Sequence, residues 1–215
     1  MRFDTCLLRP PGRRLALLAL TLSLTGCPDE KPAAMPSRVD RVATAPAPAP
    51  APVDTSRFCD KSFPSTGMDV TPWSPPPLRP LAGAAGPGEA KGWRWVTAWA
   101  TWCSPCVEEM GLLGRWKEGL TREGVPVTFE LMSVDASESE PKLREWLRKG
   151  LPGPVTWVTS PDDFQRWLGT SVGMDPDSSI PLHFVVDPSG NLRCARVGAV
   201  HAQDYGTVKA LLSGR

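Results

Sequence analysis

Hydrophobic residues follow different patterns in the two parts of this 215-residue chain. From residue 89 onward, short apolar runs typical of buried strands alternate with stretches in which apolar residues recur every three or four positions, as on one face of a helix. The clearest helical stripe consists of Cys106, Met110, Leu113, Trp116 and Leu120. Before residue 89, an apolar run at 15–24 is followed by a long proline-rich stretch that shows neither pattern.

The pattern from residue 89 onward predicts alternating strands and helices. The predicted strands lie at 93–100, 125–134, 155–158, 182–186 and 192–197. The predicted helices lie at 104–122, from 139 to just before Gly150, from Ser160 onward, and at 203–213. Strands separated by helices usually pair in parallel, whereas the short turn at 187–191 joins the last two strands as a hairpin. This order predicts an α/β domain over residues 89–215, with a mixed central sheet flanked by helices.

The first 27 residues have the features of an export signal. Arginines are concentrated in the first 14 residues, and the apolar run at 15–24 is too short for the ~20 residues that span a bilayer. The run ends in LTGC, which resembles the lipobox of bacterial lipoproteins, with Cys27 as the residue that is lipidated and becomes the mature N-terminus. An ordinary secretory signal that contains a cysteine is the alternative. We expect an exported chain, lipid-anchored to a bacterial membrane, whose domain faces the periplasm or the cell exterior.

Two proline-rich segments separate this signal from the predicted domain. Residues 28–57 contain seven prolines and no aromatic side chain. They cannot form a core, and they are predicted to be a disordered Pro/Ala-rich tether. Residues 58–88 are also rich in proline and glycine, but Phe58, Phe63 and Trp73 offer apolar anchors. We predict that this second segment is an irregular lead-in that packs on the domain.

The charge balance argues against one class of partner. The chain has 24 basic and 23 acidic residues, and this formal charge of +1 gives no support for a nucleic-acid-binding protein. Loss of the first 27 residues would remove four arginines and one aspartate, which leaves 20 basic and 22 acidic residues. The remaining chain is therefore slightly acidic.

Two cysteines at a predicted strand-to-helix junction indicate redox chemistry. Cys103 and Cys106 are separated by two residues, a spacing that allows a disulfide in the first helical turn. Unpaired N–H groups and positive partial charge at a helix N-terminus stabilise the thiolate of Cys103, which is the nucleophilic form. Cys106, one turn further in, is suited to resolve a mixed disulfide.

A pair of cysteines with this spacing is also half of a structural zinc site, which needs about four ligands. The other possible ligands are scattered along the chain: Cys59, Cys194, His183 and His201. We therefore expect no metal, and we expect no other cofactor.

The sequence around the two cysteines resembles the thioredoxin superfamily, and within it the TlpA/ResA-type membrane-anchored thiol-disulfide oxidoreductases. The run VTAWATWCSPC at 96–106 is similar to the strand and active site of that family. The dipeptide IP at 180–181, followed by FVVD at 184–187, is similar to its cis-proline strand and hairpin. Thr97 departs from the pattern, because thioredoxins have a buried Asp there and these relatives often have Asn. The resemblance covers about residues 90–215 and implies a thioredoxin-like three-layer fold.

The same resemblance implies roles for several other residues. Pro181 would follow a cis peptide bond beside the redox-active disulfide and leave the Ile180 backbone free to pair with a substrate strand. Glu109 matches the characteristic acid of the family and would take the proton of the second cysteine, although a solvated helix acid is the alternative. Trp102 would help to shape the contact with the substrate. His183 has no matching role, and we expect it to be structural or edge-exposed.

Two further cysteines remain once the signal and its lipidated residue are set aside. Cys59 and Cys194 could form a disulfide that ties the lead-in to the last strand, and some TlpA-like relatives carry a second disulfide of this kind. Two free thiols are the alternative. The loop that this disulfide closes is long, so the chain-entropy model predicts a stabilisation of ~4–5 kcal/mol.

The leading hypothesis is an extracytoplasmic thiol-disulfide oxidoreductase that reduces protein disulfides through its Cys-Ser-Pro-Cys motif. The resemblance implies a role in cytochrome c maturation or metal-site assembly, and a membrane electron donor such as a DsbD/CcdA-like thiol carrier. We expect a monomer that binds no nucleic acid. A thiol oxidase or isomerase in the same compartment is one alternative, and a non-enzymatic metal chaperone that uses the two thiolates is another.

Overall fold

The structure is a computed structural model, and it describes residues 56–81 and 92–213. The predicted export signal with Cys27, residues 28–55 of the predicted tether and residues 82–88 of the predicted lead-in lie outside the described residues. Within the described ranges, no helix combines the length and the apolar character that crossing a membrane requires.

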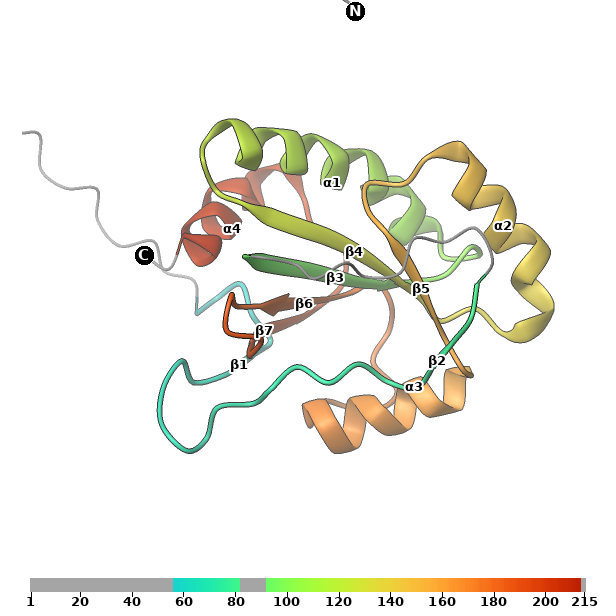
Figure 1. Cartoon of the computed structure of the whole chain (residues 1–215), viewed down its shortest axis with the longest axis horizontal. Helices are drawn as coiled ribbons and strands as arrows, with labels where there is room; N and C mark the ends of the chain where they lie inside the picture. Colours follow the sequence, from blue (N-terminus) through green and yellow to red (C-terminus); the bar gives the residue numbers. More distant parts are fainter. Residues whose placement is uncertain (1–55, 82–91, 214–215) are drawn as a thin grey trace, which may run out of the picture. The chain divides into compact units, whose positions relative to one another are not determined.

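The described residues form a mixed sheet of seven strands in the order β1-β7-β6-β3-β4-β5-β2 (Figure 1). The strands are β1 (Lys61–Ser62), β2 (Leu78–Arg79), β3 (Trp93–Trp99), β4 (Val127–Ser133), β5 (Val155–Val158), β6 (Leu182–Val186) and β7 (Leu192–Val197). The central strands β3, β4 and β5 are parallel. On one side β6, β7 and β1 continue the sheet in antiparallel pairs, and on the other side β2 pairs antiparallel with β5.

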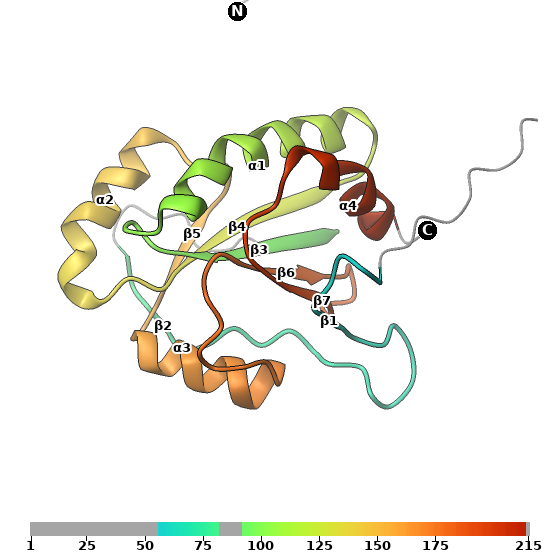
Figure 2. The same ribbon diagram turned by 180° about the vertical axis from the view of Figure 1, so that it is seen from behind.

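Helices cover both faces of this sheet. They are α1 (Ser104–Arg122), α2 (Glu140–Lys149), α3 (Pro161–Trp167) and α4 (Tyr205–Leu212). Figures 1 and 2 show α1, α2 and α4 over one face of the sheet and α3 over the other. Because β3, β4 and β5 follow one another in the sheet, the usual right-handed crossovers place α1 and α2 on the same face.

These elements confirm the fold class that was predicted from the sequence. The predicted strands and helices are present, and their ends differ from the prediction by no more than two residues. The whole apolar stripe of α1 is buried, as its spacing predicted. One feature that the hydrophobic pattern did not predict is the π-helical segment Leu168–Val172, which continues α3.

The described part of the lead-in supplies both edge strands of the sheet, which the sequence analysis missed. β1 pairs with β7, and β2 pairs with β5. Phe58 and Phe63 are buried, and the ring of Trp73 lies 5.5 Å from the ring of Phe184 on β6. Strands of two residues carry no periodic pattern, so they could not be recognised from the hydrophobic positions alone.

A disulfide joins Cys59, just before β1, to Cys194 on β7. The two residues are 135 positions apart in the sequence, and the Cys194 side chain is fully buried. The bond therefore fastens the lead-in to the sheet and closes a long loop. In the unfolded chain, such a bond removes more conformational freedom than a disulfide between near neighbours.

We expect the double substitution Cys59→Ala/Cys194→Ala to lower the free energy of unfolding by ~2–5 kcal/mol, because the unfolded chain regains the entropy of that loop. Urea denaturation of the oxidised proteins measures the loss. The matched control is Cys103→Ala/Cys106→Ala, which removes a disulfide between residues only three apart and should destabilise the chain less. Equal losses in the two double variants would contradict the expectation.

Candidate active site

Cys103 occupies the N-cap of α1, at the end of the short loop that connects β3 to the helix. Its Sγ accepts a hydrogen bond from the Cys106 backbone N–H at 3.3 Å. Cys103 and Cys106 form a disulfide, and α1 carries Pro105 at its start. The first turn of α1 contains no acidic residue. The helix N-terminus is thus arranged to stabilise a thiolate at this position.

The two sulfurs of the disulfide differ in their access to solvent. Cys103 is 5% exposed and borders a pocket, whereas Cys106 is fully buried and does not line it. An incoming sulfur from the pocket side therefore meets Cys103 first. This asymmetry separates a candidate nucleophile from a candidate resolving cysteine.

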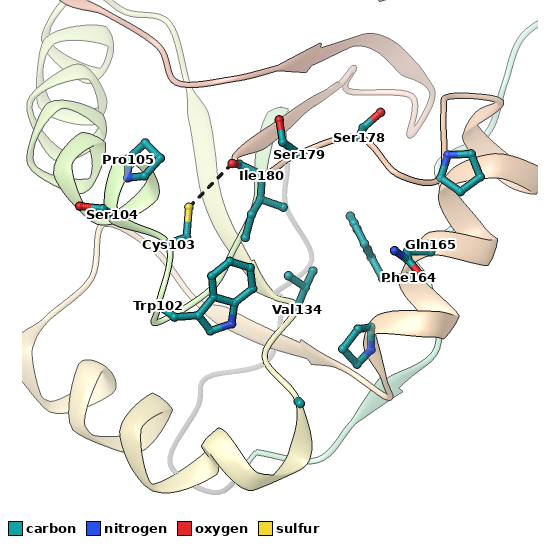
Figure 3. A pocket seen from close by; sticks show the side chains of 13 residues that line it. Trp102, Cys103, Ser104, Pro105, Val134, Phe164, Gln165, Ser178, Ser179 and Ile180 are labelled. Carbon is teal, nitrogen blue, oxygen red and sulfur yellow. Dashed lines mark hydrogen bonds between the residues drawn. The ribbon is translucent and has the colours of Figure 1, made fainter.

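The pocket beside Cys103 has a volume of about 650 Å³, and no charged side chain of the described residues lines it (Figure 3). Trp102 flanks Cys103 on one side and is 64% exposed. Phe164 and Gln165 of α3 form the opposite wall, and the segment with Ser178, Ser179 and Ile180 forms the third side. A largely apolar hollow of this kind offers contact area to the chain segment around a substrate cysteine.

Ile180 and Pro181 lie directly before β6, and Ile180 lies beside the cysteine motif. The peptide bond between them is cis, as the family resemblance implied. The Ile180 carbonyl oxygen is 3.8 Å from Cys103 Sγ, and Figure 3 marks this contact. The structure therefore brings Cys103, Trp102 and Ile180 together at one pocket.

A buried aspartate holds the loop that precedes Cys103. The Asp135 carboxylate accepts hydrogen bonds from the Thr101 backbone N–H at 3.0 and 3.1 Å, and from the Thr101 hydroxyl at 2.7 Å. It also accepts one from the Ser133 hydroxyl at 2.8 Å, and Trp157 Nε1 donates to the Asp135 carbonyl. The sequence analysis missed this residue. Its only signal was an acidic residue directly after a buried strand.

Glu109 and His183 are both buried and face each other. The Glu109 Oε2 atom accepts a hydrogen bond from the Val200 backbone N–H at 3.1 Å and lies 3.5 Å from His183 Nε2. Glu109 is 4% exposed, so it is not a solvated helix acid. His183 is fully buried in the middle of the sheet, so it is not edge-exposed.

The remaining predicted cysteines stand apart from the pocket. Cys59 and Cys194 form their own disulfide and do not line it. Within residues 56–81 and 92–213, no three or more His, Cys, Asp and Glu side chains are grouped closely enough to hold a metal ion. Cys27 lies outside the described residues.

Comparison with known proteins finds two curated relatives by sequence and solved structures of similar fold. No family model matches the chain. The chain is 30% identical over 95 residues to the thiol-disulfide oxidoreductases ResA of Bacillus thuringiensis (strain Al Hakam) and of Bacillus anthracis. The match covers 44% of this chain and 48% of each relative, so the chain spans about half the length of the curated relatives it matches.

The solved structures include the crystal structure of a thiol-disulfide isomerase from Corynebacterium glutamicum. It matches with a TM-score of 0.52 at 14% identity, over 66% of this chain and 97% of that chain. This match shows a thioredoxin-like fold, as the sequence resemblance implied. The partial match to ResA agrees with the resemblance to TlpA/ResA-type proteins that the cysteine motif indicated.

The Asp135 hydrogen bonds predict a large loss of stability when the carboxylate is removed. Asp135→Ala leaves the donors of Thr101 and Ser133 buried without their acceptor, and we expect a loss of about 2–4 kcal/mol in the free energy of unfolding. Urea denaturation measures it. Asp69→Ala, at an exposed position of the lead-in, is the matched control and should change stability by less than about 0.5 kcal/mol. Similar stabilities for the two variants would show that the buried carboxylate does not hold the loop.

Proposed function

We propose that this domain is a thiol-disulfide oxidoreductase that reduces disulfides in protein substrates through Cys103 and Cys106. The observation that carries the proposal is the disulfide at the start of α1, with one sulfur at an uncharged pocket and the other fully buried. The names of the ResA relatives support the same type of reaction.

The proposed reaction begins with both cysteines reduced. The Cys103 thiolate attacks one sulfur of the substrate disulfide, so a mixed disulfide forms while the substrate S–S bond breaks, and the released substrate thiolate takes up a proton. Cys106 then gives up its proton and attacks Cys103 Sγ, which releases the second substrate thiolate. Two electrons have passed to the substrate, and the enzyme holds the Cys103–Cys106 disulfide.

Other predicted site residues have places in this reaction. Glu109 is proposed to take the Cys106 proton, since it lies three residues further along α1 and is buried. Ile180 and Pro181 are proposed to border the bound substrate strand, and Trp102 to contact it. The closeness of Ile180 to Cys103 and the exposure of Trp102 support these roles.

The number of donors around Cys103 favours a reductant over an oxidant. Strong oxidants of this superfamily owe their potential to a stabilised reduced form. Here the Cys106 N–H is the donor to Cys103 Sγ among the described residues, Pro105 has no N–H to offer, and no cationic side chain lines the pocket. A thiolate with so few partners gains only moderate stability.

The cellular setting is proposed from the sequence. The signal-like N-terminus with Cys27 supports export and a lipid anchor, with the domain outside the cytoplasm. The family resemblance supports electron supply by a DsbD/CcdA-like membrane thiol carrier and a role in cytochrome c maturation. We further propose that the protein acts as a monomer.

Trapping tests the proposed order of attack. Cys106→Ala should accumulate a mixed disulfide between Cys103 and a peptide that contains an internal disulfide, because nothing then resolves the intermediate. Mass spectrometry after acid quenching identifies the linked residue. Cys103→Ala is the matched control and should yield no adduct. Equal adducts in the two variants would contradict the assignment of Cys103 as the nucleophile.

The reduction potential tests the proposed direction. Equilibration with glutathione or dithiothreitol buffers, followed by tryptophan fluorescence, should give a value nearer ~−270 mV, as in thioredoxin, than ~−120 mV, as in a strong oxidant. A value near the oxidant end would replace the proposed reductase with a thiol oxidase, while leaving the nucleophile assignment intact.

A further inference from the structure

The Glu109 carboxylate and the His183 imidazole meet inside the domain, between α1 and β6. Glu109 lies three residues after Cys106, and His183 lies two residues after Pro181. Their side chains are 2% and 0% exposed, and 3.5 Å separates Glu109 Oε2 from His183 Nε2. A buried titratable pair is unfavourable unless its polar atoms are satisfied, so this one requires an explanation.

The neighbours of His183 assign its tautomer. Trp95 Nε1, which can only donate, lies 3.2 Å from His183 Nδ1. The Thr97 hydroxyl lies 3.2 Å from the same nitrogen, and Thr97 is the direct register partner of His183 on β3. The indole N–H is shared between Thr97 Oγ1, at 3.1 Å, and His183 Nδ1. A proton on Nδ1 would point at this N–H, so Nδ1 acts as the acceptor. The proton of the neutral imidazole is therefore on Nε2, on the side of Glu109.

Two buried polar atoms of this pair have no hydrogen-bond partner among the described residues. They are Glu109 Oε1 and His183 Nε2. The Val200 N–H and the imidazole both approach the other carboxylate oxygen, Oε2. Arg196, the register partner of His183 on β7, lies near Asp204 and donates to the Phe58 carbonyl instead. Oε1 is thus a buried acceptor with no donor while Cys106 is held in the disulfide.

We propose that His183 is a positioning residue that holds Glu109 so that Oε1 takes the proton of Cys106. This inference rests on the proposed thiol-disulfide exchange. Reduction of the disulfide gives Cys106 an S–H on the same face of α1, one turn from Glu109. The Val200 N–H binds Oε2 and His183 Nε2 lies 3.5 Å from the same oxygen, which leaves Oε1 as the acceptor.

The proton and electron balance of the resolving step is complete with these groups. The Cys106 S–H bond breaks, and its proton passes to Glu109 Oε1, which becomes a neutral carboxylic acid. The Cys106 thiolate forms a bond to Cys103 Sγ, and the bond between Cys103 and the substrate sulfur breaks. The electron pair of that bond leaves on the substrate thiolate, and the proton held by Glu109 later returns to solvent.

A two-phase reaction with Ellman's reagent separates the two steps. The reduced full chain, mixed with a limiting amount of 5,5′-dithiobis(2-nitrobenzoate), should release one coloured thiolate when Cys103 attacks. It should release a second when Cys106 resolves the adduct. Stopped-flow absorbance follows both phases in one experiment. The first phase reports the nucleophile, and the second reports the step in which His183 is proposed to act.

His183→Asn and His183→Gln form a matched pair of amide variants. The shorter Asn can replace Nδ1 towards Trp95 but cannot reach Glu109, whereas the longer Gln can place an N–H near Oε2. We expect His183→Asn to slow the second phase about tenfold with the first phase unchanged, and His183→Gln to stay within about threefold of wild type. In a Glu109→Gln background, the two His183 variants should no longer differ, because the group that His183 positions is gone.

The outcomes distinguish this inference from the proposed function. A second phase in His183→Asn as fast as in wild type overturns the positioning role, and so does a His183→Gln variant as slow as His183→Asn. If His183→Asn does not fold, His183→Gln still tests the role, since a slow second phase in that variant overturns it. Loss of the first phase in wild type would instead overturn the proposed function itself.

Discussion

The position of β3 between β4 and β6 is the constraint on which the site depends. β3 runs parallel to β4 and antiparallel to β6. The carboxyl ends of β3 and β4 and the start of β6 therefore lie at the same end of the strands. Three segments from distant parts of the sequence converge there: the cysteine motif after β3, Asp135 after β4 and Ile180–Pro181 before β6. The geometry of the candidate site is therefore set by strand register, and the loops only complete it.

The same register builds the polar interior behind the disulfide. Thr97 and His183 are direct partners across β3 and β6, which places the imidazole under α1, the helix that carries Cys106 and Glu109. A helix on this face has to present apolar residues to the sheet, and α1 does so along its stripe. Glu109 is the exception, and His183 is the polar side chain that meets it from the sheet. Two buried polar side chains that face each other from α1 and β6 are better explained by a joint role in the site than by packing alone.

The hydrophobic pattern of the sequence predicted the long helices and strands. It did not predict contacts between distant residues that strand pairing brings together. α1 could be placed because a stripe of five buried side chains extends along it, and Cys103 because a cap must precede it. Asp135 and Thr101 lie 34 residues apart, and His183 and Thr97 lie 86 apart, so neither contact leaves a local signal. The edge strands β1 and β2 were missed for a different reason. With two residues each, they are too short to show alternation.

The lead-in is a segment outside the cysteine motif that shapes the site. It crosses the α3 side of the sheet from β1 to β2, as Figure 1 shows. Its Ser74 carbonyl accepts a hydrogen bond from Trp167 Nε1 of α3 at 2.7 Å, and its Trp73 ring packs 5.5 Å from that of Trp167. α3 in turn supplies the Phe164 wall of the pocket. The lead-in therefore supports the wall that faces Cys103, and the Cys59 disulfide fixes its far end to β7. It follows that the shape of the pocket beside Cys103 depends on a segment that the cysteine motif alone does not reveal.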